Sequence, residues 1–471
     1  MSELWRKSAL ELAAMVRGRE VSSREVVQAH LDRVEAINAH LNAIVRLLPE
    51  QALAAADEAD RLAADGTWLG PLHGIPFTVK ENIDVAGTAT THGVPALAEA
   101  IASVDAPPVE RLRAAGAIAL GRTNLPDFAL RVHTDSALHG LTRNPWNPQR
   151  TSGGSSGGEA AALASGMSPL GLGTDLGGSL RNPAHCCGVA SIKPSTGAVP
   201  AASVIPPQDQ TISYQLMSVN GVMARRIADL RAGFTAIAGQ HPRDPLSVPA
   251  AFTDLAPGER PQVAVLPEPP GGSTHPEVAA AVRRAADALA DDGFQVTEAV
   301  PPDYEQAAEL WATILAADLR VLKPLLDQLM GTGARQVIGY LTESLPASDL
   351  AGWATAHTAR HGLARRWSLW YQQYPVLLSP VWSQPAFPLD FDVASLDGAI
   401  ATLELIRPVL PANLLGTPAA VVPAGMADGM PVGVQVMGGK YTELRCLAIA
   451  EAIELRLGPL TPIDPVMGSF R

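Results

Sequence analysis

The chain has 471 residues, of which 47% are hydrophobic and 17% are charged. This composition is typical of a globular protein with a large buried core, in one large domain or in several. A formal net charge of −12, without any polybasic stretch, argues against nucleic acid or a membrane surface as a partner.

The N-terminal segment MSELWRKSALELAAMVRGRE is charged throughout and lacks the apolar run and cleavage site of a signal peptide. No uncharged apolar stretch approaches the roughly 18 to 20 residues that cross a bilayer. Three cysteines, Cys186, Cys187 and Cys446, cannot form a disulfide framework and fit a reducing compartment. We therefore expect a cytoplasmic protein, in which the adjacent Cys186 and Cys187 are small core residues rather than zinc ligands.

Residues 8–65 have the apolar spacing of helices. The second of these helices has Ser22 or Ser23 as a natural N-cap and is expected to run through Val45, and the third ends at Gly66. Residues 76–82 then predict a strand that runs into a loop, with Lys80 at the end of the strand.

The next elements alternate between helix and strand. VERLRAAG and AIALGRTN predict a helix, a glycine C-cap and a buried strand, and EAAALASG and SPLGLGTDLGG predict a helix and a short strand that enters glycine-rich backbone. Residues 303–375 are mostly helical, and the chain ends with two β-like runs and a helix over 443–457. This alternation indicates an α/β protein.

The segment TSGGSSGG at 151–158 allows several interpretations. A flexible linker has this composition, but the segment is followed at once by a helix former and lies within dense α/β pattern. A P-loop would need GK[ST] after the glycines, and a dinucleotide fingerprint would need a preceding strand, which NPWNPQRT does not provide.

The same segment matches G-x-S-x-G with Ser155 in the centre, the nucleophile elbow of Ser-His-Asp hydrolases. That elbow requires an apolar strand before the turn, and here two prolines precede it. Five glycines and serines also match such a short pattern by chance. A Ser-His-Asp α/β-hydrolase that uses Ser155 therefore remains a less favoured alternative.

Three segments together, FTVKEN, TSGGSSGGEAAALASG and GLGTDLGGSLRNPA, followed by IKPSTG, resemble the amidase signature family of serine hydrolases. The resemblance covers about residues 65–230 and returns in NLLGTPAAVVPAG and GMPVGVQVMG. It implies one amidase domain over 1–471, with a mixed twisted β-sheet covered by helices on both faces. Its regions are the N-terminal helices (1–65), the signature core (66–230), a variable, mostly helical substrate-pocket region (231–405) and a C-terminal return to the core (406–471).

The resemblance implies a Ser-Ser-Lys triad with Ser179 as nucleophile, Ser155 as bridging serine and Lys80 as base, and a cis peptide bond before Ser155. A lysine can act as a base only when it is neutral, so its pKa has to fall from about 10.4 through desolvation or nearby positive potential. Gly154 minimises side-chain crowding at the cis bond.

The resemblance also implies an oxyanion hole, since glycines can turn backbone amides toward the charge of a tetrahedral intermediate. Its donors are the backbone amides of Leu176, Gly177, Gly178 and Ser179. Asp175 and Arg181 are expected to support this loop, and Ser152 to help hold the site by hydrogen bonding. The family needs neither a metal nor an organic cofactor.

Residues outside the signature segments are harder to interpret. Most of the tryptophans at 311, 353, 367, 370 and 382 are expected in helix packing, and some of them in the wall of an acyl or aryl pocket. Asn413 fits either the edge of a pocket or hydrogen bonding within a loop.

We expect an amidase that hydrolyses a small-molecule amide, ester or carbamate through an acyl-enzyme, as a monomer or homodimer. The main alternative within the family is the glutaminase subunit of a tRNA-dependent amidotransferase, which works with partner subunits. ATTHGVPAL and NLPDFALRVHTDSALHG look more like stand-alone amidases.

Overall fold

The computed structural model describes residues 3–345 and 347–466. Its centre is a mixed sheet of 11 strands. In order across the sheet these are β1 (Ile44–Leu47), β3 (Ile118–Thr123), β2 (Pro76–Lys80), β6 (Leu170–Asp175), β8 (Val219–Ala224), β7 (Ala190–Lys193), β12 (Ala419–Ala427), β13 (Met430–Gly438), β11 (Val376–Pro380), β9 (Val263–Val265) and β10 (Val296–Glu298). A separate pair consists of β4 (Asp135–Ser136) and β5 (Gly140–Leu141).

The α-helices precede, connect and follow these strands. They are α1 (Ala9–Arg17), α2 (Ser23–Leu41), α3 (Pro49–Ala64), α4 (Pro107–Ala114), α5 (Gly157–Ala164), α6 (Arg181–Cys187), α7 (Ile212–Met217), α8 (Ile227–Ile237), α9 (Pro276–Asp291), α10 (Tyr304–Leu329), α11 (Thr332–Ser344), α12 (Leu350–Gln373), α13 (Phe391–Ala394), α14 (Leu396–Ile406), α15 (Leu410–Leu415) and α16 (Glu443–Leu457).

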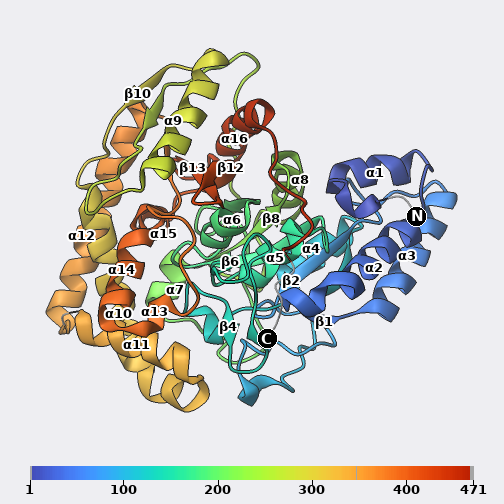
Figure 1. Cartoon of the computed structure of the whole chain (residues 1–471), viewed down its shortest axis with the longest axis horizontal. Helices are drawn as coiled ribbons and strands as arrows, with labels where there is room; N and C mark the ends of the chain where they lie inside the picture. Colours follow the sequence, from blue (N-terminus) through green and yellow to red (C-terminus); the bar gives the residue numbers. More distant parts are fainter. Residues whose placement is uncertain (1–2, 346, 467–471) are drawn as a thin grey trace.

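Helices cover both faces of the sheet, as expected for an α/β protein (Figure 1). On one face α4, α8, α9 and α16 pack against strand residues such as Val222. On the other face α5, α6, α10, α12 and α15 pack against residues such as Met223. Val222 and Met223 belong to different cores because successive side chains of a strand point to opposite faces of the sheet.

The N-terminal region forms the predicted helices α1, α2 and α3. The N-cap of α2 is Ser22, whose hydroxyl accepts from Glu25 N while the Glu25 side chain accepts from Ser22 N. The predicted end of this helix at Val45 is wrong. α2 stops at Leu41, Asn42 takes a left-handed conformation with φ of 51°, and the next residues form β1, paired antiparallel with β3.

The predicted strand, helix and strand after residue 75 are confirmed. Lys80 is the last residue of β2, and β2 pairs in parallel with β3, to which α4 connects it. β2 also pairs in parallel with β6 on its other side. At the end of the chain, α16 covers the predicted residues, Glu443–Leu457.

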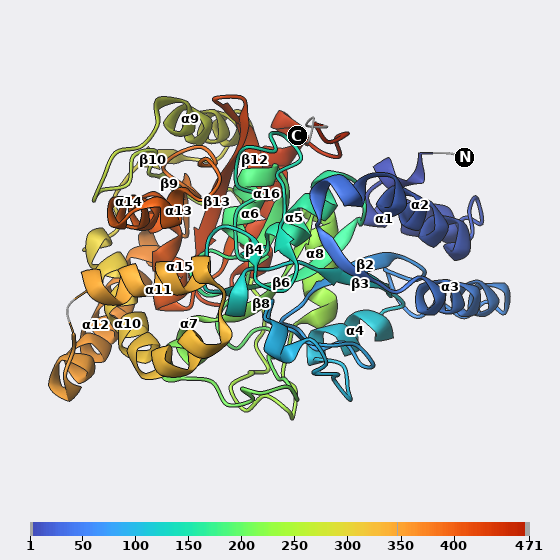
Figure 2. The same cartoon turned by 60° about the horizontal axis from the view of Figure 1, so that its bottom comes forward.

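The helices from α10 to α14 gather at one end of the molecule, and α1, α2 and α3 lie at the opposite end (Figures 1 and 2). We call α10, α11, α12, α13 and α14 the cap. The helical stretch Leu396–Leu415 is long and apolar enough to cross a membrane, but 78% of its most apolar window is buried inside the protein. It therefore has the character of a core helix.

Candidate active site

Two neighbouring parallel strands bring the predicted site segments together. β2 ends at Lys80, and β6 ends at Asp175, just before the segment that carries Ser179. Parallel strands point the same way, so these ends meet at one edge of the sheet. The glycine-serine segment joins them there, since Ser156 N donates to Ser179 O at 3.2 Å. The fold thus gathers Lys80, Ser155 and Ser179 at this edge.

Lys80 is fully buried and contacts two hydroxyl groups. Its Nζ lies 2.7 Å from Ser155 Oγ and 2.8 Å from Thr174 Oγ1. Burial lowers the pKa of Lys80 from its usual value to about 7, although the charges of Asp175 and Glu159 act in the opposite direction. Desolvation, rather than positive potential, therefore makes the neutral amine accessible near neutral pH.

The glycine-serine segment is buried along its whole length, which excludes the linker interpretation. The peptide bond between Gly154 and Ser155 is cis, as the family resemblance implies. A Cβ at Gly154 would lie 2.6 Å from the carbonyl carbon of Val132, and one at Gly153 would lie 2.6 Å from Pro183 Cα. These two glycines let the segment approach both of its neighbours more closely than any side chain would permit.

Ser179 lies where two cavities meet. The larger cavity, of about 410 Å³, is lined by Ser155, Ser179 and Thr174 together with many apolar side chains. The smaller cavity, of about 80 Å³, is lined by Ser179 and Gly177 and by cap residues such as Ile338. Ser179 is 7% exposed, while Ser155 and Lys80 are fully buried. Among the described residues, Ser179 is thus the member of the three that a substrate in either cavity can reach.

Ser155 and Ser179 both line the larger cavity, but the contacts of the described residues include no hydrogen bond between their hydroxyls. They also include none from a histidine to either serine, so the Ser-His-Asp alternative lacks its base. The hydroxyl of Ser155 accepts instead from Lys80.

Two backbone carbonyls of the segment after β6 are held in fixed directions. Leu176 O accepts from Trp311 Nε1 at 2.9 Å, and Gly178 O accepts from Asn182 N at 2.6 Å. In a trans peptide the N–H points opposite to the C=O. The amides of Gly177 and Ser179 therefore point away from these anchors, and neither donates a hydrogen bond within the described part of the chain.

The expected oxyanion set needs one correction, at Gly178. Its amide donates to Asp175 Oδ1 at 2.8 Å and is therefore not free to bind an oxyanion in this structure. Gly177 O accepts from Asn182 Nδ2 at 3.0 Å, which turns the same peptide unit toward Asp175. Of the four predicted donors, the amides of Leu176, Gly177 and Ser179 remain without a partner among the described residues.

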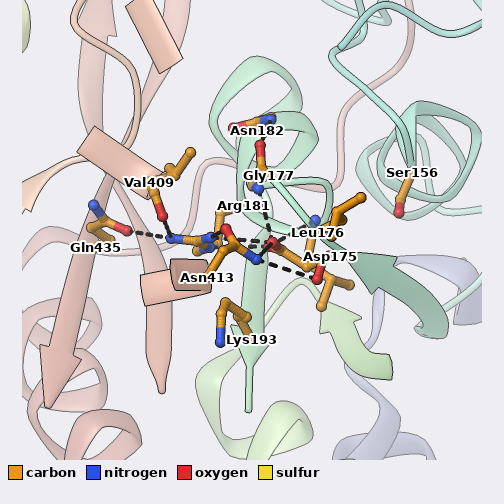
Figure 3. Close-up of polar contacts among 12 residues, drawn as sticks. Ser156, Asp175, Leu176, Gly177, Arg181, Asn182, Lys193, Val409, Asn413 and Gln435 are labelled. Atoms are coloured by element: carbon orange, nitrogen blue, oxygen red, sulfur yellow. Dashed lines mark hydrogen bonds and ion pairs between the residues drawn. The ribbon is translucent and has the colours of Figure 1, made fainter. Parts of the chain in front are cut away.

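Asp175 and Arg181 form a buried ion pair beneath this segment (Figure 3). Arg181 Nε donates to Asp175 Oδ2 at 3.0 Å, and Arg181 also donates to Asn413 Oδ1 and to Gln435 Oε1. Burial alone would raise the pKa of Asp175, but Arg181 lowers it to about 2. Asn413 Nδ2 donates to Asp175 Oδ1 at 2.8 Å, so this residue serves loop hydrogen bonding rather than a pocket edge.

Ser152 lies close to the site and supports its frame. Its Oγ donates to Thr142 O at 3.3 Å, and its carbonyl accepts from Cys187 Sγ at 3.4 Å. Cys186 and Cys187 are both fully buried, which confirms them as core residues.

Two side chains around the site, Thr174 and Asn182, were not predicted from the sequence, and the tryptophans were predicted only as a group. Thr174 lies within the GTD segment, and its place at the end of a strand beside Lys80 was a usable signal. Asn182 lies within the GGSLRNPA segment, but the sequence does not indicate that its side chain donates to Gly177 O. Trp311 lines the smaller cavity, in line with the expectation that some of the tryptophans form a pocket wall. No local pattern shows the hydrogen bond of Trp311 to Leu176 O or that of Trp382 to Asn182 Oδ1.

Within residues 3–345 and 347–466, one group of side chains could hold a metal ion. His275, Glu277 and Asp428 place their ligand atoms within 4.8 Å of one another, and two of the three are exposed. None of them lines either cavity at Ser179.

The family model described as Amidase matches residues 25–447. The chain belongs to this family. It is an amidase, a hydrolase of carbon–nitrogen bonds other than peptide bonds, as the signature segments predicted. An indoleacetamide hydrolase of Bradyrhizobium diazoefficiens is 40% identical to this amidase over 97% of the chain and 88% of the relative. An acylamidase of Rhodococcus erythropolis is 37% identical, over 91% of each chain.

Other comparisons cover the amidase equally well. A glutamyl-tRNA(Gln) amidotransferase subunit of Salinispora arenicola is 34% identical over 98% of this chain and 99% of the relative. The solved structure of 6-aminohexanoate cyclic dimer hydrolase with its substrate superposes with a TM-score of 0.85 at 28% identity, over 98% of this chain and 99% of that one. These matches confirm the predicted family fold.

Proposed function

We propose that this amidase cleaves small carboxylic amides with Ser179 as nucleophile, Ser155 as proton relay and Lys80 as base. The observation that carries the proposal is the contact of 2.7 Å between the Nζ of Lys80 and Ser155 Oγ, in a site where the pKa of Lys80 is about 7. A partly neutral lysine can accept the proton of Ser155, which in turn accepts that of Ser179.

In the first half of the reaction, Ser179 Oγ attacks the carbonyl carbon of the substrate while its proton passes to Ser155 and the proton of Ser155 passes to Lys80. The free amides of Leu176, Gly177 and Ser179 are the proposed donors to the oxyanion. The tetrahedral intermediate then expels the nitrogen, which takes a proton from Ser155 and leaves as ammonia or an amine, while Lys80 returns its proton to Ser155. In the second half, water gives a proton to Ser155, which passes its own proton to Lys80, and attacks the acyl-serine ester. The same protons then return to Ser155 and Ser179 as the carboxylic acid leaves.

The two cavities suggest where the parts of the substrate lie. The leaving nitrogen receives its proton from Ser155, and Ser155 lines only the larger of the two cavities. We therefore place the leaving group in the larger cavity and the acyl group in the smaller one. Esters and carbamates present the same carbonyl to the same donors, so they are candidate substrates as well.

The strongest rival role is that of a glutaminase within a tRNA-dependent amidotransferase, which is supported by the similarity to such amidotransferase chains. We favour the stand-alone amidase because the indoleacetamide hydrolase and the acylamidase are more similar to the chain. We further propose a single domain, since one sheet takes strands from residues 44 to 438. The three free, buried cysteines support a location in the cytoplasm, and we propose a monomer or homodimer without a nucleic acid partner.

The test combines active-site labelling with hydrolysis by the purified chain. We expect a fluorophosphonate to label Ser179, and we expect both labelling and hydrolysis to vanish in Ser179→Ala. A suitable panel contains indole-3-acetamide, simple aryl and aliphatic amides, esters and carbamates, with glutamine as the rival substrate. EDTA is expected to leave hydrolysis unchanged.

Ser156→Ala is the matched control, because Ser156 is the adjacent buried serine and lines neither cavity. Labelling at Ser155 instead of Ser179 would contradict the assignment of the nucleophile. The amidotransferase role would be favoured if glutamine were the one substrate of the panel that is hydrolysed, and if its hydrolysis required added partner subunits.

A further inference from the structure

Asn182, the second residue of α6, contacts both segments that carry the proposed serines. Its Nδ2 donates to Gly154 O at 3.3 Å and to Gly177 O at 3.0 Å. Figure 3 shows Asn182 beside Gly177. Its backbone N–H donates to Gly178 O at 2.6 Å. One residue therefore joins the peptide before Ser155 to the two peptides before Ser179.

The close fit around Asn182 depends on the absence of a side chain at Gly178. Gly178 has a φ of 91°, and a Cβ there would lie 2.3 Å from Asn182 Oδ1. Gly177 is needed for a different contact, since a Cβ there would lie 2.6 Å from Trp311 Cζ2. Any other residue at Gly178 would push the Asn182 amide out of reach of one of its carbonyl partners.

Trp382 fixes the orientation of the Asn182 side chain. An asparagine amide carries two donors on nitrogen and an acceptor on oxygen, so its orientation decides which partners it can hold. Trp382 Nε1 donates to Asn182 Oδ1 at 2.8 Å, which directs Nδ2 toward the two carbonyls. The indole is fully buried and stacks on Phe387 with ring centroids 5.4 Å apart.

We propose that Asn182 is a positioning residue that fixes the proton relay and the oxyanion donors in their positions relative to one another, and that Trp382 acts through it. The inference rests on the proposed function, since it assumes the roles of Ser155 and Ser179. Asn182 lines neither cavity, so its loss should slow the chemical steps and leave substrate binding nearly intact.

The first experiment compares Asn182→Asp and Asn182→Ala with the parent protein. The aspartate keeps the shape and the acceptor for Trp382 but loses both Nδ2 donors. We expect kcat to fall about 10- to 100-fold in both variants, with KM within about threefold, because small errors in orientation reduce rates this much.

Asn124→Asp is the matched control. Asn124 is also fully buried, and its Nδ2 donates to Gly140 O at 2.8 Å and to Thr142 Oγ1 at 3.0 Å, so it is a similar amide whose side chain bonds neither Ser155 nor Ser179. Melting temperatures of all variants show how much stability each one loses, so that a fall in kcat caused by general destabilisation can be told from one caused by displaced active-site groups. We expect the Asn124 variant to lose stability but less than about threefold in kcat.

The second experiment is a double-mutant cycle. Trp382→Phe removes the indole donor and keeps a ring for Phe387, and we expect kcat to fall several-fold. In the Asn182→Ala background the same substitution should have no further effect on kcat, because residues that act as one unit are not additive. Trp367→Phe is the control, since Trp367 Nε1 donates to a different carbonyl, Pro302 O, at 2.9 Å.

Two results would overturn the inference: a kcat of Asn182→Asp that matches the Asn124 control, or an undiminished effect of Trp382→Phe in the Asn182→Ala background. Either result with Ser179 still labelled in the parent protein would leave the proposed function intact. Failure of the parent protein to label at Ser179 would instead refute the proposed function itself.

Discussion

Lys80 is the residue that should set the pH range of the enzyme. Its pKa of about 7 means that the base is protonated below neutral pH and cannot accept the proton of Ser155. We expect kcat/KM to fall about tenfold per pH unit on the acid side of an apparent pKa near 7, and to level off above it. A pH–rate profile with a simple aryl amide measures this limb.

Lys193 provides the control for this prediction. Burial also lowers its pKa to about 7, but its Nζ donates to Pro194 O and Thr417 O, and it lines neither cavity. Lys80→Met should abolish turnover at every pH, while Lys193→Met should keep the acid limb where it is. If Lys193→Met shifts the acid limb of the pH–rate profile, the titrating group is not Lys80 and the prediction is wrong.

Among single residues, those that lie within the signature segments could be predicted from the sequence. Lys80, Ser155 and Ser179 are carried by motifs, and the fold brings all three together. Gly178 was wrongly expected to offer its amide, because no motif shows that Asp175 takes that hydrogen bond. The hydrogen bond from Trp311 to Leu176 O could not be predicted either, since 135 positions of sequence separate the two residues.

Among the elements, the short helix α6 depends on the ion pair at its first residue. Arg181→Met would leave the buried carboxylate of Asp175 without its cation, which costs about 3 to 5 kcal/mol for such pairs. Because Arg181 holds the pKa of Asp175 near 2, the stabilisation is present above the usual pKa of aspartate and is lost as the pH falls through about 2. Urea denaturation at pH 7 and pH 5 measures the difference.

In the Arg181→Met variant, burial should instead raise the pKa of Asp175, so mild acid neutralises the unpaired carboxylate. The stability gap to the parent protein should therefore be larger at pH 7 than at pH 5. Adding Asp175→Asn to Arg181→Met should recover part of the loss, since no buried charge then remains. An equal gap at both pH values would mean that the pair is not the source of the loss.

Element boundaries could be predicted where local signals are strong. The helix over 443–457 has clear apolar spacing and ends where expected. The end of α2 was missed because Asn42 turns the chain and Ile44 enters a four-residue edge strand, and only its partner β3 makes that strand favourable. Pairing with a neighbouring strand, rather than the local preference of the residues, decides whether such a short strand forms.

For the whole molecule, the order of the 11 strands was beyond sequence reasoning. β9 and β11 are parallel neighbours, yet more than 100 residues of mostly helical chain separate them. Much of this intervening chain forms the cap, which supplies most of the wall of the smaller cavity. The core thus carries the proposed reacting groups, while the cap shapes the space next to Ser179.

This division predicts that a cap substitution can change acyl preference without touching the core. Ile338 of α11 is nearly fully buried and lines the smaller cavity. Ile338→Ala should enlarge that cavity and raise the ratio of kcat/KM for bulky over small acyl amides about tenfold, because one or two methylenes in a pocket are worth this much. A series of amides with acyl groups of increasing size measures the ratio.

Ile314→Ala on α10 is the matched control, because Ile314 is equally buried in the cap core but lines neither cavity. Both substitutions should cost about 2 to 5 kcal/mol of stability, as is usual for a buried isoleucine, so stability alone cannot separate them. Only Ile338→Ala should shift the acyl ratio. If the two variants change the ratio equally, or if Ile338→Ala changes the preference for the leaving amine instead, the smaller cavity does not hold the acyl group.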